Sequence, residues 1–564
     1  MKFLTHSVHN ISFVTKNMLT LICCAAALAA CQSSTHTHLE KTHLEAKTNN
    51  KHNVLFISID DLRNELGAYG SALAQSPSID LLASKGITFD RAYAQQAICG
   101  PSRASIMTGL RPDTLEVTHN YVKFRHKFKD VKTIPQHFME NGYNAGYVGK
   151  IFHHGDKDEE NSWNWPAATH LLPAHIKAPG TYALEANNKL QDEYRKQMFA
   201  KYGEQAKYGL GRGPATEGAD VPDYAYIDGY NAEVADKTLE QLAKQDKPFF
   251  FGFGMNKPHL PWIAPKKYWD LYDPLKIKAA LAKVNQSKPK KGAAMGLHAS
   301  FELRTFSDIP NMGEIPLEQQ VHLMHSYLAC ISYIDAQIGR TIKKLEELNV
   351  LDSTVIVLWS DHGFHLSDKG IWGKASNYEI ATRVPFIIST PQTRASGQAL
   401  RTNALVELID IYPTVSELAN IPQANHVEGS SLVPLIKNPD LKWKDSALSQ
   451  FPNPALREWG AYPLRPGMRE TYFGELIVDV ENRIKKQFPE KWDRKLFEQD
   501  LMGYSLRTDR YRLIAWMNTQ TTSPEPLFVE LYDHQNDPNE NVNVAADQPH
   551  TVKTLMQKLT NRLQ

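Results

Sequence analysis

The sequence predicts an α/β fold, a mostly parallel central sheet flanked by helices. Apolar, largely β-branched runs have the length of strands buried on both faces, at 54–59, 145–149, 249–253, 354–359 and 385–390. Helical stretches lie between them: 78–86 and 134–142 each end in glycine, and 317–348 carries apolar residues at spacings of three and four. Strands that alternate with helices favour a parallel sheet.

Bulk composition excludes some classes of protein. The chain has 564 residues, enough for one large domain and a smaller one or for about three domains of average size, and its aromatic content of 10% is typical of a globular protein. Its formal net charge is only +1, which argues against nucleic acid as a partner. Attraction for an anionic substrate must therefore come from a few local cations.

Residues 1–30 have the features of a signal peptide. Two lysines precede an apolar stretch at 18–30 that is too short to span a bilayer as a helix. The stretch ends in Leu-Ala-Ala-Cys at 28–31, which resembles a bacterial lipobox and implies lipidation of Cys31. We then expect a protein of the bacterial cell envelope, held only by its lipid, with the outer membrane as the default. An ordinary secretory signal cleaved after Ala30 is the alternative.

Three further regions follow. Residues 31–52 are polar and without apolar periodicity, which predicts a tether. Residues 53–440 form the main domain, in which the basic, glycine-containing stretch 275–315 predicts an inserted surface loop, and Lys288 to Lys291 are expected to be solvated. Residues 441–564 predict a small α+β subdomain, because strand-like segments at 504–516 and 528–545 precede a C-terminal helix.

Polar side chains follow the carboxyl ends of the predicted strands. In open α/β sheets, ligands bind at that edge. An aspartate after a strand is often only a helix cap, so the joint placement of these residues matters more than any one of them. The residues that we expect at this edge are Asp60, Asp61, Lys150, Lys257, His259, Asp361, His362 and Lys374.

Three of these residues predict a metal site. The carboxylates of Asp60, Asp61 and Asp361 would repel one another unless a cation lay among them, and oxygen ligands suit a hard ion such as Ca²⁺, or less favourably Mg²⁺. His362 fits less well, because an imidazole suits a transition metal better. The cation and the lysines could neutralise an ionic ester and the charge that develops when it is cleaved.

Cys99 opens a predicted helix, with Pro101 in the first turn, where a missing N–H costs nothing. The unpaired N–H donors of a helix N-terminus favour an anion there. Two alternatives remain open. Cys99 could be a small buried hydrophobe, or it could form a disulfide with Cys330, which lies in the predicted helix 317–348.

The run from Cys99 to Arg103, with Thr108-Gly109 and Arg111-Pro112 after it, resembles the maturation signature of the formylglycine-dependent type I sulfatases. Segments at 60–70, 89–114, 133–155, 253–262 and 360–379 are similar to the iduronate-2-sulfatase branch of that family. The resemblance implies an alkaline-phosphatase-like fold, with 53–440 as the sulfatase catalytic domain. The C-terminal region resembles the antiparallel subdomain common in bacterial sulfatases.

The resemblance also implies a role for each residue at a matching position. A maturation enzyme would oxidise Cys99 to formylglycine, whose hydrate attacks the sulfur of a sulfated oligo- or polysaccharide. Asp60, Asp61, Asp361, His362 and the modified Cys99 would hold the metal, normally calcium. Arg103 would steady the hydrate; His259 would protonate the leaving alcohol and His153 would act as the base. Those expected to bind sulfate oxygens are Lys150, Lys257 and Lys374.

Two rival functions remain at this stage. Formylglycine enzymes of the same superfamily also hydrolyse phosphonate monoesters and phosphodiesters. A lipid-anchored glycan-binding protein with a vestigial site is the second rival, although every position that the mechanism needs holds a competent residue. The segment 120–130 departs from the iduronate enzyme, so the identity of the sugar stays open.

Overall fold

The five apolar runs predicted as strands join one sheet in the computed structural model of the chain. The structure describes residues 51–153, 156–166, 176, 180–286, 300–452, 468–521 and 525–564. The runs become β1 (Asn53–Ile59), β3 (Asn144–Gly149), β5 (Phe249–Gly254), β7 (Thr354–Ser360) and β11 (Phe386–Ser389). In the described part of the chain this sheet has eight strands, the others being β2 (Ile87–Tyr93), β10 (Arg383–Val384) and β12 (Leu400–Glu407).

The strand order is β10-β2-β11-β7-β1-β5-β3, with β12 paired to β2. The neighbours β7, β1, β5 and β3 are all parallel, and so are β12 and β2. β11 runs antiparallel to both of its neighbours. The carboxyl ends of β7, β1, β5 and β3 therefore meet at one edge of the sheet.

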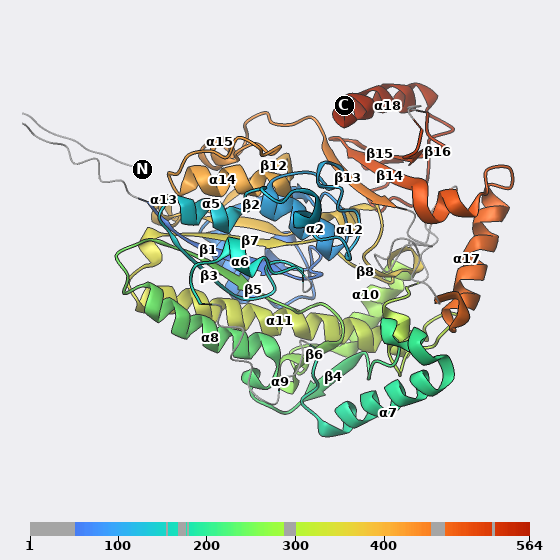
Figure 1. Cartoon of the computed structure of the whole chain (residues 1–564), viewed down its shortest axis with the longest axis horizontal. Coiled ribbons are helices and arrows are strands. Elements are labelled where there is room, and N and C mark those ends of the chain that lie inside the picture. The colour runs from blue at the N-terminus through green and yellow to red at the C-terminus, as the bar shows by residue number, and fades with distance from the viewer. Residues whose placement is uncertain are drawn as a thin grey trace, which may run out of the picture. The chain divides into compact units, whose positions relative to one another are not determined.

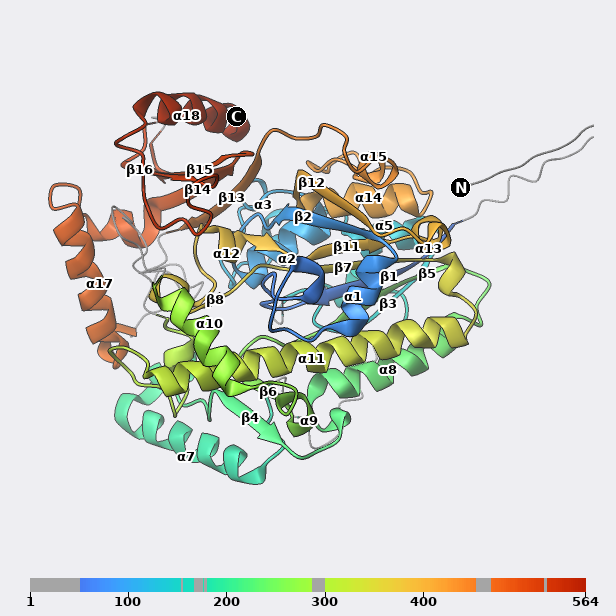
Figure 2. The same ribbon diagram turned by 180° about the vertical axis from the view of Figure 1, so that it is seen from behind.

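Helices cover both faces of the sheet (Figures 1 and 2). Alternate residues of β1 enter two different cores, because successive side chains of a strand point to opposite faces. Leu55 and Ile57 pack in the core that includes α8 (Ile227–Leu242) and α11 (Leu317–Glu347). Val54 and Phe56 pack in the core that includes α2 (Cys99–Thr108), α5 (Ile134–Glu140) and α14 (Ile411–Leu418). The prediction of a mostly parallel sheet between helices is confirmed.

The three predicted helices are present as α1 (Pro77–Ser84), α5 and α11. The remaining helices and short strands of this region connect the main elements. They are α3 (Pro112–Leu115), α4 (Phe124–Lys127), α6 (Glu159–Ser162), α7 (Glu185–Tyr202), β4 (Thr216–Ala219), β6 (Trp262–Pro265), α9 (Lys266–Trp269), α10 (Pro274–Gln286), β8 (His365–Leu366), β9 (Trp372–Gly373), α12 (Glu379–Thr382), α13 (Pro391–Ser396) and α15 (Val433–Lys437).

The C-terminal region contains the predicted antiparallel sheet. Its strands are β13 (Ala447–Pro452), β14 (Leu501–Arg507), β15 (Tyr511–Asn518) and β16 (Phe528–Asp533), and they pair in chain order. The stretch 504–516 is two strands and not one, because a turn at 508–510 reverses the chain, with the Thr508 N–H donating to the Tyr511 carbonyl at 2.8 Å. Two longer helices complete the region, α17 (Phe473–Gln487) and α18 (Pro549–Leu563).

The prediction that 275–315 is a surface loop is wrong for the residues that the structure describes. α10 spans most of its first part, and the side chains of Ile277 and Leu281, four residues apart, are fully buried. From Ser300 onward the chain enters the interior, with Phe301 and Leu303 at most 2% exposed. The apolar residues therefore hold this segment against the core, although most of the residues around them are polar. Lys288 to Lys291 lie outside the described residues.

The predicted signal peptide, the lipidation site Cys31 and most of the predicted tether also lie outside the described residues. Within the described part of the chain, no helix has both the length and the apolar character needed to cross a membrane.

Candidate active site

The expected cluster forms at the carboxyl edge of the parallel strands. Asp60 and Asp61 directly follow β1, and Asp361 and His362 directly follow the neighbouring β7, so four polar side chains share one corner of the site. The backbone at Asp61 has a φ of 64°, in the left-handed region that a non-glycine residue seldom adopts. Its N–H donates to a carboxylate oxygen of Asp361 at 3.1 Å, which ties the two strand ends together.

Cys99 is the first residue of α2 and is only 2% exposed. Its sulfur lies 3.3 Å from Oδ1 of Asp60, 3.3 Å from Nε2 of His362 and 3.7 Å from Nζ of Lys374. Burial and the Asp60 carboxylate raise the pKa of this thiol well above its usual range. A thiol that stays protonated is a poor nucleophile, so the unmodified side chain is badly suited to attack an ester.

Arg103 lies one turn along α2 and is completely buried. Its Nε donates to Oδ2 of Asp361 at 2.8 Å, and its Nη1 donates to the backbone carbonyls of Lys150 and Ile151 at 2.7 and 2.9 Å. The guanidinium therefore joins α2 to the ends of β7 and β3 and fixes Cys99 relative to the acidic residues. The structure gives Arg103 this anchoring position.

The acidic residues have the geometry of a metal site. Ligand atoms of Asp60, Cys99, Asp361 and His362 all lie within 4.8 Å of one another, and all four residues are buried. Nδ1 of His362 lies 3.0 Å from the carbonyl oxygen of Gly363, and because that oxygen only accepts, Nδ1 carries a hydrogen. Nε2 is therefore the ring atom available to a metal, and it lies 3.4 Å from Oδ1 of Asp61 and 3.3 Å from the sulfur of Cys99. The donor set fits a divalent ion.

Two lysines reach the same carboxylates. Nζ of Lys150 donates to Oδ2 of Asp60, and Nζ of Lys374 lies 2.9 Å from both carboxylate oxygens of Asp61. Burial would raise the pKa of Asp60, but Lys150 and other cations hold it well below its usual range. Burial raises the pKa of Asp61 to about 6 in spite of Lys374. Both amines are within reach of an anion bound beside Cys99.

His259 faces the cluster from the loop after β5. Its Nδ1 lies 2.6 Å from the carbonyl oxygen of Leu260, so Nδ1 carries the hydrogen and Nε2 is the atom that can take up and release a proton. Nε2 lies 4.0 Å from Oδ2 of Asp61. Burial and Lys374 lower the pKa of His259 to about 4, while Glu302 opposes that shift.

Glu302 is a site residue that the sequence analysis missed. Its carboxylate lies 3.4 Å from Nε2 of His259, 3.3 Å from Nζ of Lys374 and 3.6 Å from Nη1 of Arg212. Burial would raise its pKa, but Lys374 above all, together with His259 and Arg212, keeps that pKa below the usual range. Glu302 belongs to the segment predicted as a surface loop. It does not follow a predicted strand, so the rule that identified the other site residues does not apply to it.

Two predicted residues lie at the edge of the cluster. Nζ of Lys257 donates to the backbone carbonyls of His259 and Pro261 at 2.7 and 2.6 Å, so in this structure it braces the loop that carries His259. Its expected contact with substrate oxygens stays a prediction. His153 is largely buried near Lys150, and burial together with Lys150 lowers its pKa to about 3, so that the ring is neutral at pH 7.

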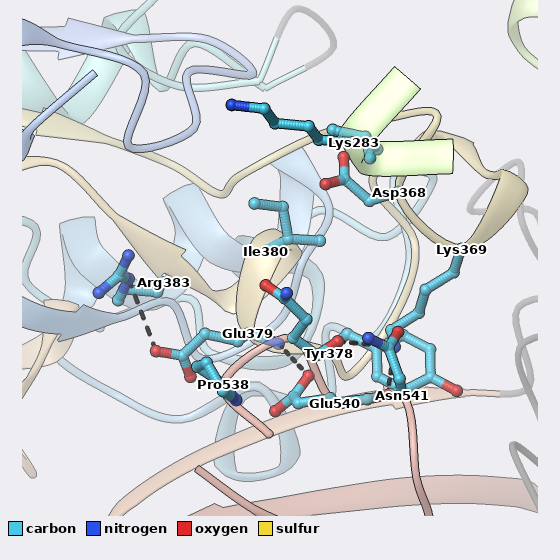
Figure 3. A pocket seen from close by; sticks show the side chains of 12 residues that line it. Lys283, Asp368, Lys369, Tyr378, Glu379, Ile380, Arg383, Pro538, Glu540 and Asn541 are labelled. Carbon is cyan, nitrogen blue, oxygen red and sulfur yellow. Dashed lines mark hydrogen bonds and ion pairs between the residues drawn. The ribbon is translucent and has the colours of Figure 1, made fainter. Parts of the chain in front are cut away.

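A hollow of about 230 Å³ opens beside the first turn of α2. Gly100 and His153 form part of its wall, so it lies next to Cys99. A different cavity, of about 290 Å³, lies between α12 and the loop 538–541 of the C-terminal region (Figure 3). There the side chain of Lys369 donates to backbone carbonyls of Asn539 and Glu540, so this second cavity is part of the contact that joins the two regions.

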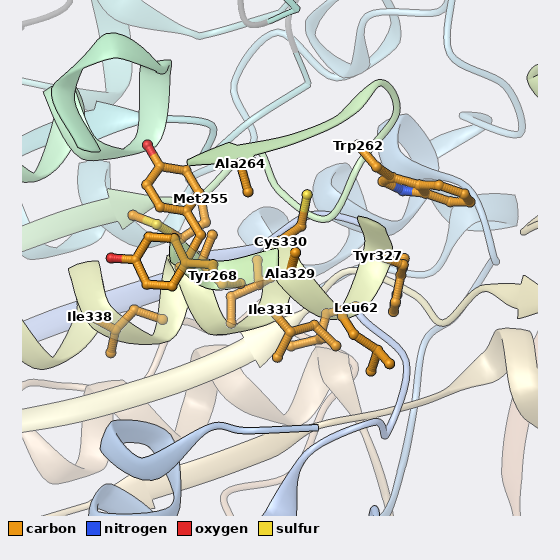
Figure 4. Packing of buried hydrophobic residues seen from close by; sticks show 14 of the residues in the cluster. Leu62, Met255, Trp262, Ala264, Tyr268, Tyr327, Ala329, Cys330, Ile331 and Ile338 are labelled. Atoms are coloured by element: carbon orange, nitrogen blue, oxygen red, sulfur yellow. The ribbon is translucent and has the colours of Figure 1, made fainter. Parts of the chain in front are cut away.

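Both cysteines of the described residues are free thiols. Cys330 is fully buried on α11 within the apolar cluster shown in Figure 4. Its thiol contacts the backbone carbonyl of Ile263 at 3.6 Å. The structure therefore does not contain the Cys99–Cys330 disulfide, and Cys330 has the packing role that its place in the helix predicts.

Known proteins that are similar to this chain in sequence or in fold are sulfatases and related hydrolases. The Sulfatase family matches residues 52–421. Iduronate 2-sulfatase of Mus musculus is 31% identical over 547 residues, covering 88% of this chain and 91% of that protein. The crystal structure of the phosphonate monoester hydrolase of Agrobacterium radiobacter has a TM-score of 0.62 at 21% identity, covering 91% of this chain and 95% of that one.

A further solved structure is described as a complex with its substrate D-glucosamine-2-N,6-O-disulfate. It has a TM-score of 0.57 at 20% identity and covers 91% of this chain and 98% of that one. At such low identity the two solved structures show the shared fold alone. The family match and the iduronate 2-sulfatase similarity extend over most of the chain and give the activity, that of a sulfuric ester hydrolase. The chain belongs to the Sulfatase family, close to the iduronate 2-sulfatase branch.

Proposed function

We propose that this sulfatase removes sulfate from a sulfated carbohydrate, using a nucleophile derived from Cys99 and a bound divalent metal. The observation that carries the proposal is the position of Cys99. It is buried at the start of α2, within 3.8 Å of two carboxylates, an imidazole and an ammonium group. No such arrangement is needed to pack a small apolar side chain, and the raised pKa of the thiol disfavours a simple thiolate nucleophile.

The proposed nucleophile is formylglycine, which a maturation enzyme would produce by oxidising Cys99. Its hydrate supplies a hydroxyl group that can attack sulfur. Asp60, Asp61, Asp361 and His362 would hold the divalent ion. Ca²⁺ is favoured over Mg²⁺ because it accepts several protein ligands in a flexible geometry, whereas Mg²⁺ usually binds one or two carboxylates and keeps several waters. The ion would supply positive charge beside the sulfate. Arg103 would position both the nucleophile and the metal ligands, because it donates hydrogen bonds to the carboxylate of Asp361 and to the backbone carbonyl of Lys150, which follows β3.

The other residues bind the sulfate and move protons. Lys150 and Lys374 offer ammonium groups to the sulfate oxygens, and Lys257 fixes the loop of His259 and stays a candidate for the same task. In the net reaction the bond between sulfur and the sugar oxygen breaks, water supplies the new oxygen of sulfate, and the sugar oxygen gains a proton. A sugar alkoxide is a poor leaving group and therefore needs that proton early.

Nε2 of His259 is the proposed source of this proton. In the free site the imidazole is neutral at pH 7, since its pKa is about 4. A sulfate ester bound beside it would bring negative charge, which favours the protonated ring, as the Glu302 carboxylate already does. His153, neutral at pH 7, is the proposed base that later removes a proton from the nucleophile.

Phosphonate or phosphodiester hydrolysis is the alternative activity within the same fold. The similarity to the Agrobacterium radiobacter hydrolase shows the fold only, whereas the similarity to iduronate 2-sulfatase is higher and covers most of the chain. Assays of an aryl sulfate and a phenyl phosphonate monoester on one matured preparation separate the two activities. A preference for the phosphorus ester would overturn the proposal.

The main experiment combines two cysteine variants with mass spectrometry. In matured protein, the peptide that contains residue 99 should have the mass of formylglycine, and Cys99→Ala should lose all turnover of 4-methylumbelliferyl sulfate. Cys330→Ala is the matched control, because Cys330 is equally buried but lies in an apolar cluster. It should retain activity. An intact thiol at position 99 in protein that still hydrolyses sulfate esters would refute the proposed nucleophile.

The place of action remains a proposal from the sequence. We propose that lipidation of Cys31 anchors the enzyme to the bacterial outer membrane, where it acts on extracellular or periplasmic saccharides. Metabolic labelling with a tagged fatty acid should mark the natural chain and not Cys31→Ser. Equal labelling of both, or of neither, would contradict the anchor.

A further inference from the structure

The hollow beside Cys99 is built from the segment that departs from the iduronate enzyme. Its volume is about 230 Å³, enough for roughly one sugar ring. Residues of 120–124 line one side, and Gly100, Ala104, Phe152, His153 and Asp156 line the rest. None of these residues, apart from His153, has a role in the chemistry proposed above.

This hollow is fixed against the start of the nucleophile helix. The N–H of Gly100 donates to Oδ1 of Asn120 at 2.8 Å. A Cβ atom at position 100 would lie only 2.7 Å from that oxygen and 3.1 Å from the Cα of Asn120, so the absence of a side chain allows this close approach. A group bound in the hollow therefore lies beside Gly100, the residue that directly follows the proposed nucleophile Cys99.

The lining combines an apolar floor with a positive charge. Phe124 and Phe152 are buried, while Tyr121 is 49% exposed. Lys123 is exposed, and within the described residues no carboxylate lies within ion-pair distance of its ammonium group. Aromatic faces and a cation are a combination that suits an anionic sugar.

The segment around Lys123 is also positively charged. Residues 119–130 contain four lysine and arginine side chains against one aspartate, in a protein whose formal net charge is only +1. Arg125 is bound by Asp158 at 2.6 and 2.7 Å, and Lys127 pairs with Glu116. Burial and Asp158 raise the pKa of Asp156, the acidic residue of the lining, while Lys123 lowers it, so these two side chains interact electrostatically although no ion pair joins them among the described residues. Lys123 is the lysine of the lining, and its ammonium group is therefore the positive charge that the hollow offers to a ligand.

We propose that this hollow is a substrate subsite for a second anionic group, a carboxylate or another sulfate, and that Lys123 binds it. The inference rests on the proposed carbohydrate sulfatase function and narrows the substrate to saccharides that carry two negative groups. Lys123 is then a specificity-determining residue, since it contacts the substrate away from the sulfur that is attacked.

The test compares Lys123→Met with Lys129→Met, which removes an exposed lysine of the same segment that does not line the hollow. Four probes are used with matured enzyme: 4-methylumbelliferyl sulfate, glucosamine 6-sulfate, glucosamine 2-N,6-O-disulfate and 4-methylumbelliferyl iduronide 2-sulfate. The last two carry a second sulfate and a carboxylate, so they separate the two sources of negative charge.

We expect Lys123→Met to lower kcat/KM about tenfold on at least one two-anion probe, mainly through a higher KM. Its activity on 4-methylumbelliferyl sulfate should stay within about twofold, Lys129→Met should change nothing, and Lys123→Arg should restore much of the loss. An equal loss on all probes would show a structural role and overturn the inference. So would unchanged kinetics, or no turnover of either two-anion probe by the natural enzyme. Failure to hydrolyse any sulfate ester would instead overturn the proposed function.

Discussion

Arg512 holds the C-terminal sheet to the segment that follows Lys374, and its loss should destabilise the protein strongly. It is completely buried on β15, where its Nε and Nη2 contact carboxylates of Glu540 and Glu379, and its Nη1 donates to the Ser505 hydroxyl at 2.6 Å. Arg512→Met would leave the buried carboxylate of Glu540 and the partly buried carboxylate of Glu379 without their main partner. Breaking a buried ion pair on one side costs about 3–5 kcal/mol.

The structure places the expected cost near the lower end of that range, about 3 kcal/mol. Glu379 would keep Arg507 at 3.2 Å, and Glu540 would keep Nε2 of His534 at 2.8 Å. Activity should fall as well, because Glu379 starts α12 just after the loop that carries Lys374. That loop is held from the other side by Asn377, whose amide donates to the carbonyls of Phe451 and Gly503, both at 3.1 Å.

Urea denaturation followed by tryptophan fluorescence measures the change in the free energy of unfolding. Arg510→Met is the matched control. It lies two residues away in sequence and pairs with Asp533 at 2.7 Å, but its side chain is 46% exposed, so its loss should have little effect. The reasoning would be refuted if the two variants had equal stability, because burial would then not determine the strength of these contacts.

Two further predictions concern the metal and pH. Dialysis against a chelator should abolish hydrolysis of aryl sulfates and lower the thermal midpoint, with Ca²⁺ restoring both, since a ligand that binds only the native state stabilises it; full activity in excess chelator would contradict the metal site. Burial lowers the pKa of His365 from 6.5 to about 4. The unfolded chain therefore takes up this proton first, and stability that is present above pH 6.5 falls as the pH drops, by about 2 kcal/mol between pH 7 and 5. His365→Asn should flatten that part of the stability profile, and an unchanged slope would refute the assignment.

The strand ends could be predicted because a simple rule links sequence to position. Apolar runs such as 54–59 and 354–359 mark buried strands, and in a parallel sheet their carboxyl ends must share an edge. Asp60, Asp361 and Lys150 were placed together on that basis, and the structure brings them together. The direction of β11 could not be predicted in this way, since an apolar run has the same composition whether it runs parallel or antiparallel.

Glu302 shows what such a rule misses. It reaches the site from an irregular segment, and no periodicity marks it. The available signal was weak: Phe301 and Leu303 flank it, and both are buried. A charged residue between two apolar ones in a basic stretch is also typical of many surface segments, so only the fold decides that its carboxylate meets His259 and Lys374. The hydrogen-bond acceptors of Lys257 could not be predicted either, because these backbone carbonyls are brought to its ammonium group by the path of the loop.

The arrangement separates the residues that cleave the ester from those proposed to select the sugar. The acidic residues of the metal site come from the ends of β1 and β7, and Arg103 fixes them to α2 through contacts that do not involve 120–124. The proposed subsite meets that framework at the Gly100–Asn120 contact, and it shares Ala104 of α2 and the proposed base His153 with it. Substitutions at Tyr121 or Lys123 can therefore alter which saccharide binds without disturbing the metal ligands. A change at Gly100 should affect both, because any side chain there would press on Asn120 and on the first turn that presents Cys99.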